Sequence, residues 1–317
     1  MARGAAPSSP KSHRGAALIT AVLVTALVAI TAAAMATRQQ LDIRRTGNLV
    51  NGDQAYLYSL GMENWAIQIL ARDRLDNAED HLAERWAAEI TPIEVDGGAL
   101  SGRIIDLQGR FNLNALVNGN QVDQRQLTRY LNLLRILGLD PELAPPLIDW
   151  LDADPDPGIP NGAEDLEYLG RKPAYRSANG PLLTPADLLS IKGYTRESVA
   201  KLSPLISTLP EVTALNVNTA PALVLQALSD KMTAADAQSL VAARNESEKG
   251  FPSIGEFLQR DEVAGTGLDT VGLSLDSRYF LIEATVEFGG RSHTLYSLLR
   301  RDDKGKSVVL ARSREVY

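Results

Sequence analysis

The chain has 317 residues, 44% of them hydrophobic, and a formal net charge of −7. This length exceeds one compact core and predicts two or three packed units. The chain contains no cysteine, which excludes disulfides and thiolate metal sites, so any structural ion would have to be held by oxygen atoms. The negative charge disfavours binding to the phosphate backbone of nucleic acids.

An apolar run of 21 residues, from 16 to 36, contains no charged residue, glycine or proline. At about 1.5 Å per residue, a helix of this length spans the ~30 Å hydrocarbon core of a membrane. Near-helical spacing of apolar residues continues beyond the run, at Leu49, Tyr56, Leu60, Ile67 and Leu70. The sequence therefore predicts one long helix that leaves the membrane. The alternative is a secretory signal peptide cleaved at the AAAMA segment.

The stretch HRGAALITAVLVTAL resembles a type IV prepilin leader, in which a basic segment ending in glycine precedes the apolar helix. The resemblance implies cleavage between Gly15 and Ala16, with Ala16 as the N-methylated first residue. The leader carries Arg3, Lys11 and Arg14 and no acid, so its removal would leave a net charge of −10.

Most pilins have glutamate at the fifth mature position, where this chain has Thr20. A carboxylate inside a bilayer is costly unless it is paired, and in pilins it is thought to meet the N-terminus of a neighbouring subunit. The absence of this glutamate resembles the K-type minor pseudopilin of type II secretion, the general secretion pathway protein K family. That resemblance implies the first, tip-most position in the assembly. The alternative is a neutral residue tolerated in an ordinary anchor.

Behind the anchor, HLAERWAAEI predicts a short second helix, and the Gly-punctuated residues 98–116 predict strands. Three alternating runs near the C-terminus, separated by GG and DDKGK, predict antiparallel hairpins. Between these regions the pattern is helical, with Gly138 as a helix stop and Asp140 beginning the next helix. The predicted fold class is α+β: a pilin-like long N-terminal membrane helix packed on an antiparallel sheet, with a large all-α insertion containing two helix-hairpin-helix or SAM-like units.

This interpretation divides the chain into six parts. They are a leader (1–15), an anchor helix (16–36), a first pilin-like part (37–116), a first helical unit with an acidic loop (117–207), a second helical unit (208–275) and C-terminal strands that complete the sheet (276–317).

Seven acids and no base lie in one short Pro/Gly-rich segment: Asp149, Asp152, Asp154, Asp156, Glu164, Asp165 and Glu167. Calcium takes six to eight oxygen ligands, and a bent loop exposes backbone carbonyls that add to carboxylates. The segment is not an EF-hand, because Pro157 replaces the turn glycine and Glu164 comes one residue late.

The sequence instead predicts a distinct structural calcium site. The ligand candidates are Asp152, Asp154, Asp156, Glu164 and Asp165, with Asp149 or Glu167 in reserve. The resemblance also implies calcium in this region. The alternative is a solvated acidic loop.

Two segments resemble helix-hairpin-helix units of DNA-binding competence proteins: PLLTPADLLSIKGYTRESVAKLSPLI, a weaker earlier copy, and LNVNTAPALVLQALSDKMTAADAQSLVAARNESEKGFPSIGEFL. DNA-binding versions need glycine-rich hairpins near basic side chains. The second hairpin has no glycine and the first has one, so both are interpreted as packing modules. A membrane-tethered DNA-binding protein is the alternative function.

Catalytic patterns are weak, and the chain is not expected to be an enzyme. His81 and His293 lack metal-ligand spacing and are expected at the surface or in the sheet, GTGLD is expected to be a loop, and Trp65, Trp86 and Trp150 are expected in the core. The resemblance implies a minor pseudopilin in the inner membrane with a periplasmic body. Its expected partners are other minor pseudopilins, prepilin peptidase and membrane lipid, with secreted substrates or the outer-membrane secretin as further candidates and no nucleic acid.

Overall fold

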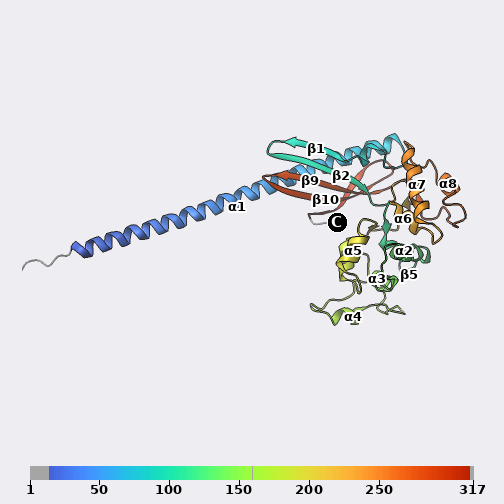
Figure 1. Ribbon diagram of the computed structural model, residues 1–317, viewed down its shortest axis with the longest axis horizontal. Helices are drawn as coiled ribbons and strands as arrows, with labels where there is room; N and C mark the ends of the chain where they lie inside the picture. Colours follow the sequence, from blue (N-terminus) through green and yellow to red (C-terminus); the bar gives the residue numbers. More distant parts are fainter. Residues whose placement is uncertain (1–13, 159, 315–317) are drawn as a thin grey trace, which may run out of the picture. The chain divides into compact units, whose positions relative to one another are not determined.

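The computed structural model describes residues 14–158 and 160–314 (Figure 1). The chain divides into two compact units, residues 1–54 and 55–317. Most of the predicted leader, residues 1–13, lies outside the described residues. A single helix, α1, runs from Arg14 to Asp76.

Among the described residues, α1 is the one helix long and apolar enough to cross a membrane, with a mean hydropathy of 2.4 in its most apolar stretch. Its apolar side chains between residues 18 and 35 are exposed. The threonine hydroxyls there donate to carbonyls one turn earlier, as Thr31 does to Leu27 at 3.0 Å. These polar groups are satisfied within the helix, which suits an apolar solvent.

Five antiparallel strands form the main sheet, in the order β1-β2-β9-β10-β11. The strands are β1 (Ile90–Val95), β2 (Gly98–Asp106), β9 (Tyr279–Phe288), β10 (Arg291–Arg301) and β11 (Ser307–Ser313). Gly289 and Gly290 both have positive φ, at 58° and 75°, which suits a two-residue hairpin. The predicted GG turn and C-terminal strands are confirmed.

The central pairing of the sheet joins the two ends of the body. β2 pairs with β9 from Gly98↔Phe288 to Asp106↔Phe280, and Figure 1 shows these strands side by side. The whole helical region lies between them in sequence. The prediction of an antiparallel sheet with an inserted helical part is confirmed at this level.

The C-terminal half of α1 packs on this sheet. Met62, Ala66 and Leu70 are buried in one core with Phe280. Gly102 allows the close approach, because a Cβ there would lie 2.9 Å from Met62 Cε and 2.4 Å from the Glu283 carbonyl oxygen.

Two expectations for this region are wrong. Residues 81–90 form no second α-helix, but a three-residue 3₁₀ turn, η1 (Arg85–Ala87), followed by β1. The Glu84 carboxylate accepts from the His81 N–H at 3.0 Å and from Trp86 Nε1 at 2.6 Å, which holds the chain in turns. Trp65 is 47% exposed rather than in the core. Trp86 is buried as expected, 5.3 Å from the Phe280 ring.

The helical region has one continuous core. Its helices are η2 (Leu113–Leu116), α2 (Gln124–Ile136), η3 (Pro141–Leu143), α3 (Ala144–Leu151), α4 (Asp165–Leu169), η4 (Pro185–Ser190), α5 (Arg196–Leu202), α6 (Ala222–Ala227), α7 (Ala234–Glu246) and α8 (Ile254–Gln259). Three two-residue ladders tie the region together: β3 (Phe111–Asn112) with β6 (Ile206–Ser207), β4 (Val117–Asn118) with β5 (Gln121–Val122), and β7 (Leu215–Asn216) with β8 (Leu273–Ser274).

Capping residues that the sequence predicted lie at two helix ends. Gly138 follows α2 with φ +65°, and the Asp140 carboxylate accepts from the Glu142 N–H at 2.9 Å. Both predicted boundaries are confirmed. The predicted GTGLD loop is also confirmed, with positive φ at Gly265 and Gly267.

A buried charged cluster lies where α1 and the sheet meet. Arg301 is 1% exposed and donates to Asp80 at 2.5 and 2.6 Å and to Asp73 at 3.0 Å. Among the described residues, Asp73, Asp80 and Glu84 form the one set of three carboxylates with ligand atoms within 4.8 Å of one another. The Arg301 guanidinium pairs with Asp73 and Asp80 and offsets part of the negative charge of this cluster.

Candidate functional site

The acidic loop connects α3 to α4 and is folded around Asp149 at the end of α3. Asp149 is 2% exposed and accepts from the Gly158 N–H at 3.1 Å and the Ala163 N–H at 2.6 Å. A Cβ at Gly162 would lie 2.2 Å from Asp149 Oδ2, so a larger residue there would displace the carboxylate. Asp149, a reserve ligand in the sequence interpretation, therefore organises the loop from inside.

Several oxygen atoms around the loop are buried without a hydrogen-bond donor among the described residues. They are Asp152 Oδ1, both Glu164 carboxylate oxygens, Asn179 Oδ1 and Ser177 Oγ. Buried acceptors are nearly always satisfied in folded proteins, and unsatisfied carboxylates are especially costly. A set of oxygen acceptors without donors is what a hard cation such as calcium would satisfy.

The electrostatics of the loop point the same way. Burial, together with the negative charges of Asp149, Asp152, Asp165 and Asp154, raises the pKa of Glu164 to about 7. Burial, together with Asp154 and Asp149, raises the pKa of Asp152 to about 6. These two carboxylates lack a compensating positive charge, which a bound cation would supply.

The other predicted ligands lie differently. Asp154 Oδ1 accepts from the Asp156 N–H at 3.0 Å, and Asp156 itself is exposed. Asp165 accepts from the Ser177 N–H at 3.0 Å and pairs with Arg176 at 3.2 Å.

No three carboxylates of this loop bring oxygens within 4.8 Å of one another in the part of the chain that the structure describes. Of the five candidates, Asp152 and Glu164 have buried oxygens without a hydrogen-bond donor among the described residues. The complete ligand set stays a prediction.

Sequence reasoning did not single out the side chains of Asn179 and Ser177. Asn179 Nδ2 donates to the Asp154 carbonyl at 3.1 Å, which leaves its Oδ1 facing no donor. The φ of Asn179, 43°, lies in the left-handed region. Only the folding of the later turn onto the loop makes it a candidate ligand.

A cluster of aromatic side chains packs at the two ends of the loop. The Trp150 ring lies 5.3 Å from Tyr168, and Tyr168 stacks on Tyr175 at 5.4 Å. The Arg171 guanidinium lies 4.9 Å from the Tyr168 ring centroid. Trp150 is buried as predicted, and these rings fix the two ends of the loop.

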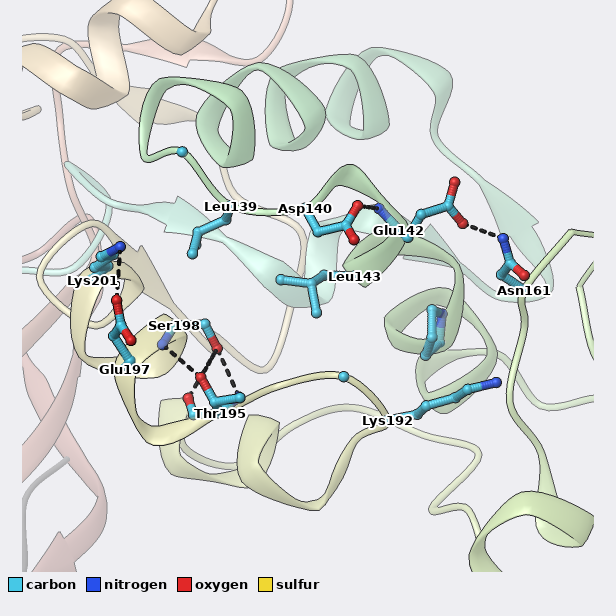
Figure 2. A pocket seen from close by; sticks show the side chains of 13 residues that line it. Leu139, Asp140, Glu142, Leu143, Asn161, Lys192, Thr195, Glu197, Ser198 and Lys201 are labelled. Carbon is cyan, nitrogen blue, oxygen red and sulfur yellow. Dashed lines mark hydrogen bonds and ion pairs between the residues drawn. The ribbon is translucent and has the colours of Figure 1, made fainter.

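Beside the loop, a cavity of about 560 Å³ is lined in part by the hairpin of the first candidate helix-hairpin-helix segment. Figure 2 shows Lys201 paired with Glu197 at 3.2 Å, and Asn161 bonded to Glu142. Lys192, also in the wall, pairs with Glu167 at 3.7 Å. The lysines here are matched by acids, so the cavity is not a basic phosphate-binding surface.

The anchor segment carries its own candidate feature. Thr20 Oγ1 donates within α1 to the carbonyls of Ala16 at 3.1 Å and Ala17 at 3.0 Å. The side chain of Thr20 is thus neutral, and its hydroxyl is satisfied by its own helix. Cleavage between Gly15 and Ala16 stays a prediction.

His81 differs from its expected surface position. Its side chain is buried, because residues 77–86 fold back and Glu84 lies 3.6 Å from His81 Nε2. His293 lies in β10 as expected.

The family described as "Type II secretion system (T2SS), protein K" matches this chain in two parts, residues 109–211 and 215–276. The type II secretion system protein K of Pseudomonas aeruginosa is 39% identical over 95% of this chain and 93% of its own length. The protein of the same name from Aeromonas hydrophila is 31% identical over 96% of this chain and 98% of its own length.

A solved structure, the GspK-GspI-GspJ complex from the type 2 secretion system of enterotoxigenic Escherichia coli, contains a similar chain. It has a TM-score of 0.77 and 26% identity, and the match covers 86% of this chain and all of that one. These matches do not favour the DNA-binding alternative. The long apolar helix, the antiparallel sheet with helices and the sequence matches together show that the chain belongs to the type II secretion system protein K family and is a minor pseudopilin.

Proposed function

We propose that this minor pseudopilin occupies the tip of the pseudopilus and helps initiate or limit its assembly for protein export across the outer membrane. Thr20 carries this proposal: its hydroxyl is satisfied by the Ala16 and Ala17 carbonyls, so the anchor brings no carboxylate that must pair with a neighbour. A subunit without that requirement suits the first position.

The proposed partners are other minor pseudopilins. The related chain from Escherichia coli was solved in a complex with GspI and GspJ, which supports counterparts of these two as neighbours. Contacts with secreted substrates or the outer-membrane secretin belong to the same proposal. The protein would act by association rather than catalysis.

The proposed location follows from the anchor. Prepilin peptidase would cleave between Gly15 and Ala16, and inner-membrane lipid would surround residues 16–36. The body, from about residue 37 onward, would lie in the periplasm. Residues 37–116 and 276–317 would form the pilin-like part.

Residues 117–207 and 208–275 would be two helix-hairpin-helix or SAM-like packing units. Around the first candidate hairpin the lysines pair with acids, as Lys192 does with Glu167, and Lys231 of the second hairpin donates to the Gly265 carbonyl at 3.3 Å. Packing of the helical part, rather than phosphate binding, is the proposed role.

Calcium would hold the first helical unit together. The unsatisfied buried oxygens of Asp152, Glu164 and Asn179 support this proposal, and Asp154, Asp156 and Asp165 complete the candidate ligands. When bound, the ion would neutralise the carboxylates and link the α3 end, the α4 start and the turn at Asn179.

The first experiment is intact mass measurement with N-terminal sequencing, on protein extracted from membranes of cells with and without prepilin peptidase. We expect a start at methylated Ala16 that is lost without the peptidase. A start after the AAAMA segment would instead mean ordinary signal cleavage and would contradict the proposal.

The tip position needs a second test. Because the chain has no cysteine, a single cysteine introduced in the anchor reports neighbours by crosslinking. We expect Thr20→Glu to add crosslinks to a subunit on the side that the wild type leaves free, whereas Thr20→Ser should keep the wild-type pattern. An identical pattern for all three would contradict the role of Thr20.

A further inference from the structure

A cavity of about 310 Å³ lies apart from the acidic loop, where residues 81–83 face the end of α7. Its walls are formed by His81, Leu82, Ala83, Arg244, Asn245, Ser247 and Gly250. None of its lining residues is acidic, and two of them carry buried groups that can hold positive charge.

Arg244 is a buried cation without an acidic partner. It is 5% exposed, and Nη1 donates to the Val217 carbonyl at 3.1 Å and the Ala220 carbonyl at 2.7 Å. Nε reaches Asn245 Oδ1 at 3.5 Å, and no carboxylate of the described residues forms an ion pair with this guanidinium. Burial lowers the pKa of Arg244 to about 10. Carbonyl dipoles orient the group but leave its charge uncompensated.

His81 contributes a second unpartnered group. It is 7% exposed, and its Nδ1 is buried with no hydrogen-bond partner among the described residues. On the other side of the ring, Nε2 lies 3.6 Å from Glu84 Oε1. Glu84 is itself engaged by Asn77 and Trp86 and does not line the cavity.

Ser247 adds a polar wall. Its Oγ accepts from the Lys249 N–H at 3.3 Å, which leaves the hydroxyl proton for another acceptor. A guanidinium, an imidazole and a hydroxyl therefore border one cavity, and each can donate to an oxygen atom that the chain does not supply there.

We propose that this cavity binds an oxyanion of carboxylate or phosphate size. The planar guanidinium matches both groups, and the charge of buried Arg244 has no acidic partner among the described residues. The ligand could be a carboxylate presented by an acidic side chain of a docking protein, or a phosphoryl group.

The test is thermal unfolding of the full chain in detergent, with inorganic phosphate or acetate replacing chloride at constant ionic strength. We expect either anion to raise the unfolding midpoint in a saturable way, because a ligand that binds the folded state stabilises it by mass action. Stabilisation by both anions identifies a carboxylate-type site, and stabilisation by phosphate alone identifies a phosphoryl site.

Two variants at Ala83, an exposed lining residue, keep Arg244 and its carbonyl contacts intact. Ala83→Glu places a carboxylate at the cavity wall and should weaken the apparent anion affinity at least about tenfold. The matched Ala83→Gln should respond like the wild type. The proposal is overturned if neither anion shifts the wild-type midpoint, or if Ala83→Glu and Ala83→Gln respond equally.

Discussion

Buried carboxylates have different partners in two regions of the body, the sheet with its packed α1 segment and the acidic loop. In the sheet unit, Arg301 pairs with Asp80 and Asp73, and Arg312 pairs with Glu63 at 2.7 and 2.8 Å. In the acidic loop, Asp152 and Glu164 keep buried oxygens that no donor of the described residues satisfies. Asp80, Asp73 and Glu63 therefore have cations of this chain as partners, whereas Asp152 and Glu164 have none among the described residues, which supports the proposed calcium ion.

The largest effect is expected from Arg301→Met. Burial already raises the pKa of Asp80 to about 7, although the Arg301 charge lowers it. Removal of Arg301 leaves buried carboxylates without their cation, which typically costs about 3–5 kcal/mol. Urea unfolding of the full chain in detergent measures the loss, and Arg300→Met, at the exposed neighbouring position, is the control. Equal losses for the two variants would contradict this account.

Calcium should give the next largest effect, confined to the loop. At a free concentration 100 times its dissociation constant, calcium should stabilise the protein by about 2.7 kcal/mol over the metal-free form. Glu164→Gln should abolish most of this gain, whereas Glu197→Gln, which alters an 81% exposed carboxylate, should keep it. Unfolding with and without a chelator measures the difference. A calcium effect of equal size in both variants would remove Glu164 from the ligand set.

The calcium effect should also depend on pH. The pKa of Glu164 is raised from 4.5 to about 7. In the metal-free protein, this shift therefore stabilises the folded state fully below pH 4.5, and the stabilisation is lost as the pH rises through 7. Calcium binds the ionised form and reverses this loss, so its effect should be larger at pH 7.5 than at pH 5. The same unfolding experiment at both pH values decides, and equal effects would argue against these carboxylates as ligands.

Glu63→Gln should cost about 2 kcal/mol, because it removes the charge of a buried carboxylate that forms a bidentate pair with the half-buried Arg312. The Arg312 charge and the Ser297 hydroxyl lower the pKa of Glu63 although burial raises it. Its contribution is therefore present at neutral pH and lost as the pH falls through this lowered value. The difference between wild type and variant should shrink in acid. Glu287→Gln, on an exposed position of β9, should show neither effect.

The smallest effect is expected at an exposed pair across the same sheet. Arg103 and Glu283 are register partners on β2 and β9, and their side chains meet at 2.8 Å. Glu283→Gln should cost less than about 1 kcal/mol, because solvent screens such pairs. High salt should remove most of the difference between the variant and the wild type. If Glu283→Gln lowered the free energy of unfolding as much as Glu63→Gln does, burial would not explain the difference between the two pairs.

Much of the fold was predictable because its signals are local. Gly138 and Asp140 set helix ends, and the pair Gly289 and Gly290 sets a hairpin, each through the conformation of one or two residues. The predicted helix over residues 81–90 failed because the Glu84 carboxylate binds donors that a propensity argument does not consider. The prediction that Trp65 lies in the core was wrong because helical spacing does not show which face of α1 the sheet covers, and Trp65 lies on an exposed face.

The sequence by itself determined the apolar anchor, the neutral Thr20, the capped helices and an acidic loop without nearby bases, since these follow from composition and short spacing. Only the tertiary structure decided that Arg301 meets Asp80, 221 residues away, and that Asn179 turns toward the loop. Such pairings depend on β2 meeting β9 and on the helical core closing, because long-range contacts form only when the intervening chain has folded.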